Sequence, residues 1–206
     1  MMRNIHWHGH SSFRLQTQAG LVLYIDPWRL SRDNPKADLV LITHPHHDHC
    51  SPDDVAALSK PDTVIAGPAG IAAALARKTV ALAPGEKTAL CGIAVETVPA
   101  YNIGRPFHPA QAGNLGFIVT VDGTRVYHAG DTDLIPEMKT LKTDMALLPI
   151  GGTYTMDPQE AAQAAALLGP AAAVPMHYGK HVGAYALAQD FLKLAVTPVT
   201  ILPEEK

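Results

Sequence analysis

Four apolar runs of strand length lead into side chains that can bind a metal ion. The runs end at Ile25, Ile42, Tyr127 and Val174, and the polar residues that follow them are Asp26, His44, His128, Asp131 and His177. In α/β proteins, functional sites usually lie at the carboxyl ends of the strands. One such coincidence would carry little weight, but four are difficult to assign to packing alone. The pattern therefore predicts an α/β fold whose strand ends carry a site rich in histidine and aspartate.

The densest of these groups contains four histidines and one aspartate within six residues. Imidazole nitrogen and carboxylate oxygen are common ligands of first-row transition metals. His44 and His46, two residues apart, can point the same way and share one ion, whereas Asp48 and His49 turn with the loop toward a second. A polar loop that happens to be rich in histidine is the alternative, and Pro45 as a turn residue fits it. That alternative does not explain why the group follows a buried strand so abruptly.

The composition narrows the classes of partner. The chain has 206 residues, of which 47% are hydrophobic and 17% charged, and a net charge of -3, which gives no basic surface for nucleic acid or an anionic membrane. No apolar run is long enough for membrane insertion, and the opening Met1 to His6 lacks the apolar stretch of a signal peptide. Two cysteines form no disulfide framework, so we expect a cytoplasmic protein. We expect a small-molecule substrate and leave a homo-oligomer open.

Segments with strand and helix signals follow one another along the chain. The sequence Asp157-Pro158-Gln159-Glu160 is typical of a helix start and predicts a helix to Leu168. Further helices are expected over 51–58, 69–77 and 183–194. Strands are expected over 5–7, 12–15, 21–25, 39–42, 63–66, 79–82, 93–98, 116–121, 125–128, 145–149, 171–175 and 199–202. The halves have a similar element order, so we expect one domain over 1–206 with a junction at the Pro-, Gly- and Asn-rich segment 100–113.

The sequence resembles the metallo-β-lactamase-fold hydrolases. Four segments carry this resemblance in the family's order: Ile25-Asp26-Pro27, His44 to His49, Tyr127 to Thr132, and Pro175 to Gly179. The opening Trp7 to Phe13 is similar to the branch of the ascorbate-6-phosphate-lactonase-like and N-acyl-phosphatidylethanolamine phospholipase D-like proteins. The resemblance implies a four-layer αβ/βα sandwich, in which two mixed sheets lie face to face with helices outside. It also implies a dinuclear metal site at the edges of the sheets.

The resemblance further implies roles for individual residues by their positions in these motifs. His44 and His46 would bind the first metal, Asp48, His49 and His177 the second, and Asp131 would bridge both. Asp26 would orient a ligand histidine, as carboxylates beside metal ligands commonly do. We expect two divalent ions, with zinc as the first choice and manganese as the alternative.

The chain departs from the branch at Asn102, where most members have a histidine as third ligand of the first metal. An amide oxygen is a neutral, hard ligand that suits zinc poorly. Three alternatives follow: His108, six residues further on, replaces the missing ligand; Asn102 binds a harder ion such as manganese; or the first site is weak and often empty. We favour His108, because a catalytic zinc normally keeps three protein ligands. The alternative is that His108 is a solvated loop histidine without a role at the metal.

Two cations held close together can share a hydroxide and polarise a substrate oxygen. This chemistry predicts a metal-dependent hydrolase that uses a metal-bound hydroxide on an ester, lactone, thioester or phosphodiester of a small, anionic substrate, with Asp48 essential for catalysis. A nuclease-type phosphodiesterase is one alternative, although such enzymes usually carry an inserted domain and a basic surface. A non-catalytic metal-binding protein is the other, and Asn102 is the one feature that favours it.

The remaining histidines and cysteines have weaker assignments. His10 lies in a Gly-His-Ser segment that matches the branch, and we expect it at the rim of the site. His128 either lies behind the ligands or is a buried, hydrogen-bonded strand histidine. His8 and His181 are expected at the surface, as are His6 and His47. For Cys50, directly after His49, a buried and unreactive thiol is the interpretation we favour.

Overall fold

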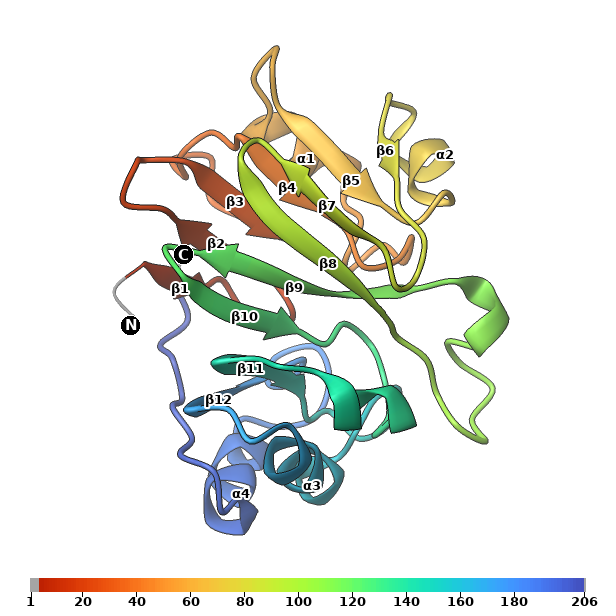
Figure 1. Cartoon of the computed structure of the whole chain (residues 1–206), viewed down its shortest axis with the longest axis vertical. Coiled ribbons are helices and arrows are strands. Elements are labelled where there is room, and N and C mark those ends of the chain that lie inside the picture. The colour runs from red at the N-terminus through yellow and green to blue at the C-terminus, as the bar shows by residue number, and fades with distance from the viewer. Residues whose placement is uncertain (1–3, 206) are drawn as a thin grey trace.

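Two six-stranded sheets lie face to face in the structure, a computed structural model that describes residues 4–205 (Figure 1). The first sheet has the order β1-β2-β3-β4-β5-β6, and these strands span Ile5–Trp7, Phe13–Gln16, Val22–Ile25, Leu39–Leu41, Val64–Gly67 and Val80–Ala81. The second has the order β12-β11-β10-β9-β8-β7, and β7 to β12 span Lys87–Leu90, Ile93–Pro99, Leu115–Val121, Thr124–His128, Met145–Pro149 and Ala172–Met176. The segment Met1 to His6 was expected to lack a signal peptide, and its first three residues lie outside the described residues.

Each sheet has an antiparallel and a parallel part. In the first sheet, β1 to β3 are antiparallel and β3 to β6 are parallel. In the second sheet, β7 to β10 are antiparallel and β10 to β12 are parallel. Because parallel neighbours run in one direction, β3 and β4 end at the same edge, and so do β10, β11 and β12. These mixed sheets, with helices outside, confirm the predicted αβ/βα sandwich.

The central strands of the first sheet are buried on both faces. Leu23 packs into the core between the sheets, whereas its neighbour Tyr24 and Val40 of the next strand face outward into a second core. Helices α1 (Pro52–Leu58) and α2 (Ile71–Leu75) cover that second core with their apolar residues. Successive strand side chains point to opposite faces, so a strand covered on both faces is apolar throughout. This explains why these strands appear in the sequence as unbroken apolar runs.

Helices α3 (Pro158–Leu168) and α4 (Ala186–Leu194) cover the second sheet on its outer side (Figure 1). The side chain of Asp157 accepts the N–H of Glu160 at 2.8 Å, and the side chain of Glu160 accepts the N–H of Asp157 at 3.0 Å. Gly169, with φ +58°, ends the helix in the left-handed conformation that glycine adopts at little cost. The predicted start and end of α3 are therefore confirmed.

Some expected elements differ in the structure. The segment expected as a strand over 199–202 forms only an isolated bridge between Val199 and Ala173, because Pro198 and Pro203 on either side have no N–H to continue a ladder. Strand β7 was not expected, since its side chains are largely exposed and no apolar run indicates it. The chain changes sheets between β6 and β7, whereas the segment 100–113 connects β8 and β9 within one sheet.

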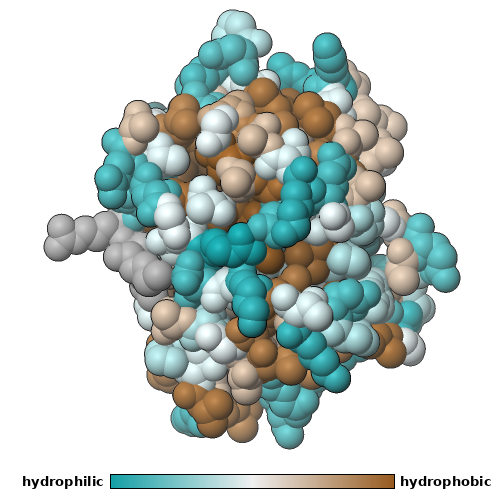
Figure 2. Space-filling model, viewed as in Figure 1, coloured by the Kyte–Doolittle hydropathy of each residue, from teal (hydrophilic) through white to brown (hydrophobic). Residues whose placement is uncertain are grey.

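The surface carries no sign of a membrane span within residues 4–205, because no helix there is long and apolar enough to cross a bilayer. Hydrophilic residues interrupt the hydrophobic patches on the face drawn in Figure 2.

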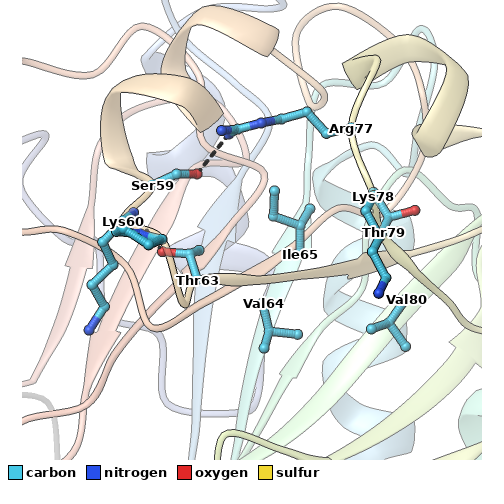
Figure 3. Close-up of a pocket in the computed structure, with 10 residues that line it drawn as sticks. Ser59, Lys60, Thr63, Val64, Ile65, Arg77, Lys78, Thr79 and Val80 are labelled. Carbon is cyan, nitrogen blue, oxygen red and sulfur yellow. Dashed lines mark hydrogen bonds between the residues drawn. The ribbon is translucent and has the colours of Figure 1, made fainter.

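A hollow of about 600 Å³ lies at the amino ends of β5 and β6, and Figure 3 shows Arg77 reaching across it to the hydroxyl of Ser59. The residues that line this hollow include no histidine, cysteine or carboxylate, so it offers none of the usual metal ligands.

Candidate metal centre

The predicted ligands come together at the carboxyl ends of strands from both sheets. The loop between β4 and α1 carries His44, His46, Asp48 and His49, the loop after β10 carries Asp131, the turn after β12 carries His177, and the β8–β9 loop carries His108. Their ligand atoms form overlapping groups in which all atoms lie within 4.8 Å of one another. The site was expected at the edges of the two sheets. The packing of the sheets brings four separate segments together in one compact cluster there.

Three imidazoles form the first group. The Nδ1 of His46 lies 3.0 Å from the Nε2 of His44 and 3.2 Å from the Nε2 of His108. Two nitrogen ligands of a tetrahedral zinc, each about 2.0–2.1 Å from the ion, lie about 3.3 Å apart. The spacing of these nitrogens therefore fits a shared metal ion. Asn102 lies outside the group, whereas His108 offers a third nitrogen beside His44 and His46.

The second group contains His10 in addition to the expected Asp48, His49 and His177. The Nε2 of His10 lies 3.1 Å from the Oδ2 of Asp48, and the Nε2 of His49 lies 3.9 Å from the same oxygen. His10 also packs against His177, with ring centroids 4.1 Å apart. His10 was expected only at the rim, but it is 4% exposed and lies within reach of an ion in this group.

Asp131 lies between the two groups. Its Oδ2 is 3.1 Å from the Nε2 of His177 and 3.6 Å from the Nε2 of His108, and its Oδ1 is 3.4 Å from the Nε2 of His49. The carboxylate therefore faces both groups at once, which is the position expected of a bridging ligand. Within residues 4–205, neither the Oδ1 of Asp131 nor the Nε2 of His49 has a hydrogen-bond partner, although both atoms are buried. Buried polar atoms are normally paired, so this pair of atoms fits a bound cation.

Asp26 orients two of the histidines. Its Oδ2 accepts a hydrogen bond from the Nδ1 of His49 at 2.7 Å, and it also accepts the hydroxyl of Thr43 at 2.6 Å. The Thr43 hydroxyl in turn accepts the Nδ1–H of His44 at 2.9 Å. Both histidines are thereby left with Nε2 directed at the metal groups, the arrangement that outer carboxylates produce in metal sites. Sequence reasoning found Asp26 but missed Thr43.

Asn102 lies directly behind His108. Its Oδ1 accepts the Nδ1–H of His108 at 2.8 Å, and its Nδ2 donates to the Oδ1 of Asp133 at 2.7 Å and to the carbonyl of Tyr154 at 2.9 Å. Asp133 is buried, and Arg105 lies 3.3 Å from its Oδ1. The amide is thus fixed from both sides, and it fixes the tautomer and ring plane of His108. Sequence reasoning missed Asp133 and Arg105, because both stand in unpatterned loop sequence.

The other histidines and Cys50 divide between backbone contacts, core and surface. His128 donates from Nε2 to the carbonyl of Ser11 at 2.9 Å and accepts the N–H of Gly130, which corresponds to the alternative of a hydrogen-bonded strand histidine. His8 was expected at the surface, and this is wrong: it is 7% exposed, because its ring packs inward on Tyr24. His47 and His181 are exposed, as expected. Burial raises the pKa of the Cys50 thiol to about 11, which supports an unreactive cysteine.

Four side chains of the centre extend from strained backbone. His10, Asp26, His108 and His177 have φ between +45° and +54°. The left-handed region costs a residue with a Cβ roughly 1–2 kcal/mol, and such strain persists where the surrounding structure holds it and is often functional. Each of these residues follows a strand or lies in a loop at the site, where the turn redirects the side chain toward the ligands.

Burial and charge set the protonation of the ligands. Burial, followed by the charge of His49, lowers the pKa of His44, so this imidazole is neutral and its Nε2 has a free lone pair. Burial opposes the charge of Asp131, but His177 and His49 outweigh it and hold the pKa of this carboxyl below its usual value. Burial likewise opposes the charge of Asp48, and the hydrogen bond from His10 and the charge of His49 lower its pKa. Burial opposes the charge of His49, but Asp131 and Asp26 outweigh it and raise the pKa of this imidazole well above its usual value, so His49 must release a proton when it binds a divalent cation.

A cavity of about 540 Å³ opens onto the metal groups. Its floor includes His46, Asp48, Asp131 and His177, and its walls are Trp28, Arg29, Phe107, Tyr154, His181 and Val182. This is the size of cavity that holds a small organic molecule. The arrangement can therefore bring a small substrate directly over the candidate metal positions.

The sequence is similar to that of metal-dependent hydrolases. Residues 4–177 match the family model of the Beta-lactamase superfamily domain. The UPF0173 metal-dependent hydrolase of Thermoplasma acidophilum is 35% identical, over 96% of this chain and 94% of its own length. The UPF0173 metal-dependent hydrolase of Caldivirga maquilingensis is also 35% identical, over 86% of this chain and 82% of its own length.

Solved structures show the same similarity in three dimensions. A Parabacteroides distasonis protein, proposed to be a metal-dependent hydrolase, is 36% identical with a TM-score of 0.86, over 98% of this chain and 93% of its own. A metallo hydrolase from the archaeon Ignicoccus hospitalis is 28% identical with a TM-score of 0.79, over 98% and 95% of the two chains.

Proposed function

The chain belongs to the UPF0173 metal-dependent hydrolases of the β-lactamase superfamily, and we propose that it cleaves an ester, lactone or phosphodiester bond in a small, anionic substrate. The observation that carries the proposal is the position of Asp131 between two groups of convergent ligand atoms, at the floor of a cavity of about 540 Å³. When bound, two divalent ions supply an acidified water and polarise the substrate oxygen. The side chains hold the ions and position the substrate.

We propose zinc as the metal, with manganese as the alternative. The first ion would be held by His44, His46 and His108, and their nitrogen-only donor set favours zinc over manganese. The second would be held by Asp48, His49 and His177, with His10 close enough to join them. Asp131 would bridge the two ions. Asn102 would act on the metal only through His108, since its amide groups are already engaged with His108, Asp133 and Tyr154.

The same features argue against the alternatives. A net charge of -3 speaks against a nuclease-type enzyme with a basic surface, and we propose a small-molecule substrate in a cytoplasmic protein. A non-catalytic metal-binding protein would have little use for a substrate-sized cavity over the ligands.

The segment from Trp7 to Phe13 supports the lactonase-like and phospholipase D-like branch. We also propose that residues 1–206 form one domain.

Metal content and hydrolysis, measured on the same preparations, test the proposal. Protein purified without chelator is expected to contain close to two ions per chain and to hydrolyse generic esters or phosphodiesters, and removal of the metal should abolish the hydrolysis. His47→Ala is the matched control for metal content, because His47 lies in the same loop with a side chain that is 88% exposed. Fewer than one ion per chain, with no uptake of added zinc or manganese, would contradict the metal site. Full metal content without hydrolysis would favour the non-catalytic alternative.

A further inference from the structure

One wall of the cavity over the metal groups carries an arginine in a constrained position. Arg29 has φ +56°, in the left-handed region, and it is not a glycine or asparagine for which that region is common. The carboxylate of Asp54, in the first turn of α1, accepts the backbone N–H of Arg29 at 2.9 Å and that of Leu30 at 3.0 Å. The loop is therefore fastened in this conformation, which sends the Arg29 side chain toward the cavity.

The guanidinium of Arg29 is held by neutral groups. Its central carbon lies 4.5 Å from the centre of the Trp28 ring, and its Nη1 lies 2.8 Å from the Nε2 and 3.2 Å from the Nδ1 of His181. Burial, followed by the charges of Arg29 and Lys180, lowers the pKa of His181, so the imidazole is neutral and can accept a hydrogen bond from Arg29. Among the described residues, Arg29 forms no ion pair with a carboxylate. The positive charge is thus oriented and accessible, with no carboxylate among these residues paired to it.

Two rings in contact, those of Trp28 and His10, lie between Arg29 and His177. Trp28 packs against His10 with ring centroids 5.1 Å apart, and His10 packs against His177 at 4.1 Å. A group bound at Arg29 is therefore separated from the candidate ions by the width of these rings. It would be a remote part of the substrate, and the bond to be cleaved would lie over the metals.

The other end of the cavity is aromatic. Phe107 and Tyr154 are 40% and 38% exposed, and their rings meet edge to face with centroids 4.7 Å apart. Phe107 directly precedes His108, so this pair borders the first metal group, whereas Trp28 and Arg29 border the second. Exposed aromatic rings beside a polar centre are typical of a site that binds an apolar part of a ligand.

We propose that Arg29 binds a carboxylate of the substrate, remote from the bond that is cleaved, while Phe107 and Tyr154 bind its apolar end. This inference rests on the proposed hydrolase function and narrows the substrate to a small monoanionic ester or lactone with an apolar body. A single guanidinium with no paired carboxylate among the described residues matches one substrate carboxylate, which it can bind through two parallel N–H bonds. Trp28 and His181 act as positioning residues, because they hold the guanidinium in place.

Equilibrium binding to the zinc-loaded, full-length protein tests the carboxylate contact. Glutaric acid monoanilide carries a phenyl ring and a remote carboxylate, and its primary amide is a neutral probe of the same shape. Calorimetry should give at least tenfold tighter binding of the acid than of the amide. Arg29→Gln should weaken the acid about tenfold and leave the amide unchanged, since a charged hydrogen bond of this kind contributes about that much. Arg29→Lys keeps the positive charge but cannot form two parallel N–H bonds, so its affinity for the acid should lie between those of the wild type and Arg29→Gln.

Arg32→Gln is the matched control, because Arg32 is an exposed arginine of the same loop that does not line the cavity. Equal binding of acid and amide to the wild type, or an equal loss of both affinities in Arg29→Gln, would overturn the proposal.

Hydrolysis of mono-4-nitrophenyl glutarate and of neutral 4-nitrophenyl butyrate tests the carboxylate contact and the hydrolase function separately. If both esters are cleaved and Arg29→Gln keeps the preference between them, the carboxylate contact is wrong and the hydrolase function stands. If neither is cleaved but the binding difference holds, the contact stands and the proposed cleavage of monoanionic esters fails.

Discussion

We propose that the amide of Asn102 and the imidazole of His108 together replace the single histidine ligand of the branch that the sequence resembles. His108 brings Nε2 to within 3.2 Å of His46, and Asn102 fixes its orientation from Nδ1. Contacts of this outer kind commonly change metal affinity by about 10- to 100-fold. In this proposal the ligand lies six residues further along the loop, and Asn102 at the family position orients it through the hydrogen bond to Nδ1.

We predict that His108→Ala and Asn102→Ala differ in metal stoichiometry. His108→Ala should lower the zinc content from about two ions per chain to about one, because a third protein ligand of the first ion is lost. Asn102→Ala should keep two ions at saturating zinc but release one of them to a chelator at roughly tenfold lower chelator concentration. Elemental analysis and chelator titration measure both effects. Loss of one ion from Asn102→Ala, with full content in His108→Ala, would show that Asn102 is the ligand.

A second residue-scale prediction concerns the Cys50 thiol beside the histidine loop. With its pKa raised to about 11 by burial and an exposed fraction of 2%, Cys50 should react with a thiol reagent at pH 8 only after unfolding. Cys50→Ser removes this late-reacting thiol and serves as the control. Rapid labelling of Cys50 in the native protein would mean that the histidine loop opens in solution.

At the scale of elements, helix starts hold the loops that build the site. Ser51 caps α1 immediately after the histidine loop, and Asp54 of the same helix fastens the backbone of Arg29. Glu160 of α3 has two partners, since its Oε2 accepts both the Asp157 N–H and the Nη2 of Arg105 at 3.0 Å. Arg105 contacts Asp133, which contacts Asn102. The start of α3 is thus linked to the position of His108.

We expect Asp157→Ala to destabilise the protein by about 1 kcal/mol, because the cap satisfies an otherwise unpaired N–H at the start of α3. Urea unfolding of the metal-free protein measures this as a lower midpoint with an unchanged slope. Gln159→Ala, an exposed change on the first turn of the same helix, should have an effect within about 0.5 kcal/mol of zero. An equal effect of the two substitutions would mean that the cap does not contribute.

At the scale of the whole molecule, the metal centre joins the two sheets. The first sheet supplies the loop after β4, and the second supplies Asp131 and His177 from the ends of β10 and β12. An ion bound between them would add to the apolar core and to hydrogen bonds such as that from the Leu115 N–H to the Thr43 carbonyl, which already join the two sheets. The ligands themselves extend from loops and turns, so the core does not depend on any one of them.

We therefore predict that Asp48→Ala and His177→Ala abolish hydrolysis but leave a folded protein. Circular dichroism should show unchanged secondary structure, while zinc at a hundredfold excess over its Kd should stabilise the wild type by about 2.7 kcal/mol per bound ion. Thermal unfolding with and without zinc measures this stabilisation. Each variant should lose the part of the stabilisation that comes from binding of the second ion. Unfolding of both variants would mean that these residues are needed for the fold.

Much of the fold followed from patterns within single segments. The apolar runs, the turn residues and the capping sequence of α3 act locally, and the fold class and most element positions were predicted from them. The strand expected over 199–202 was wrong, because two prolines prevent the ladder that its apolar residues suggested. Strand β7 was missed, because a strand with mostly exposed side chains gives no apolar run.

The sequence by itself determined which side chains reach the strand ends, because burial of a strand fixes where its polar residues must begin. Only the tertiary structure decided how those ends face one another. It brought His10 to Asp48, placed His108 rather than Asn102 beside His46, and set the guanidinium of Arg29 over Trp28 at the cavity wall. These contacts depend on sheet packing and on left-handed turns at residues such as His10 and His108, which no local periodicity encodes. Contacts between residues distant in the sequence are set by the assembled fold, and the chemistry of this centre consists of such contacts.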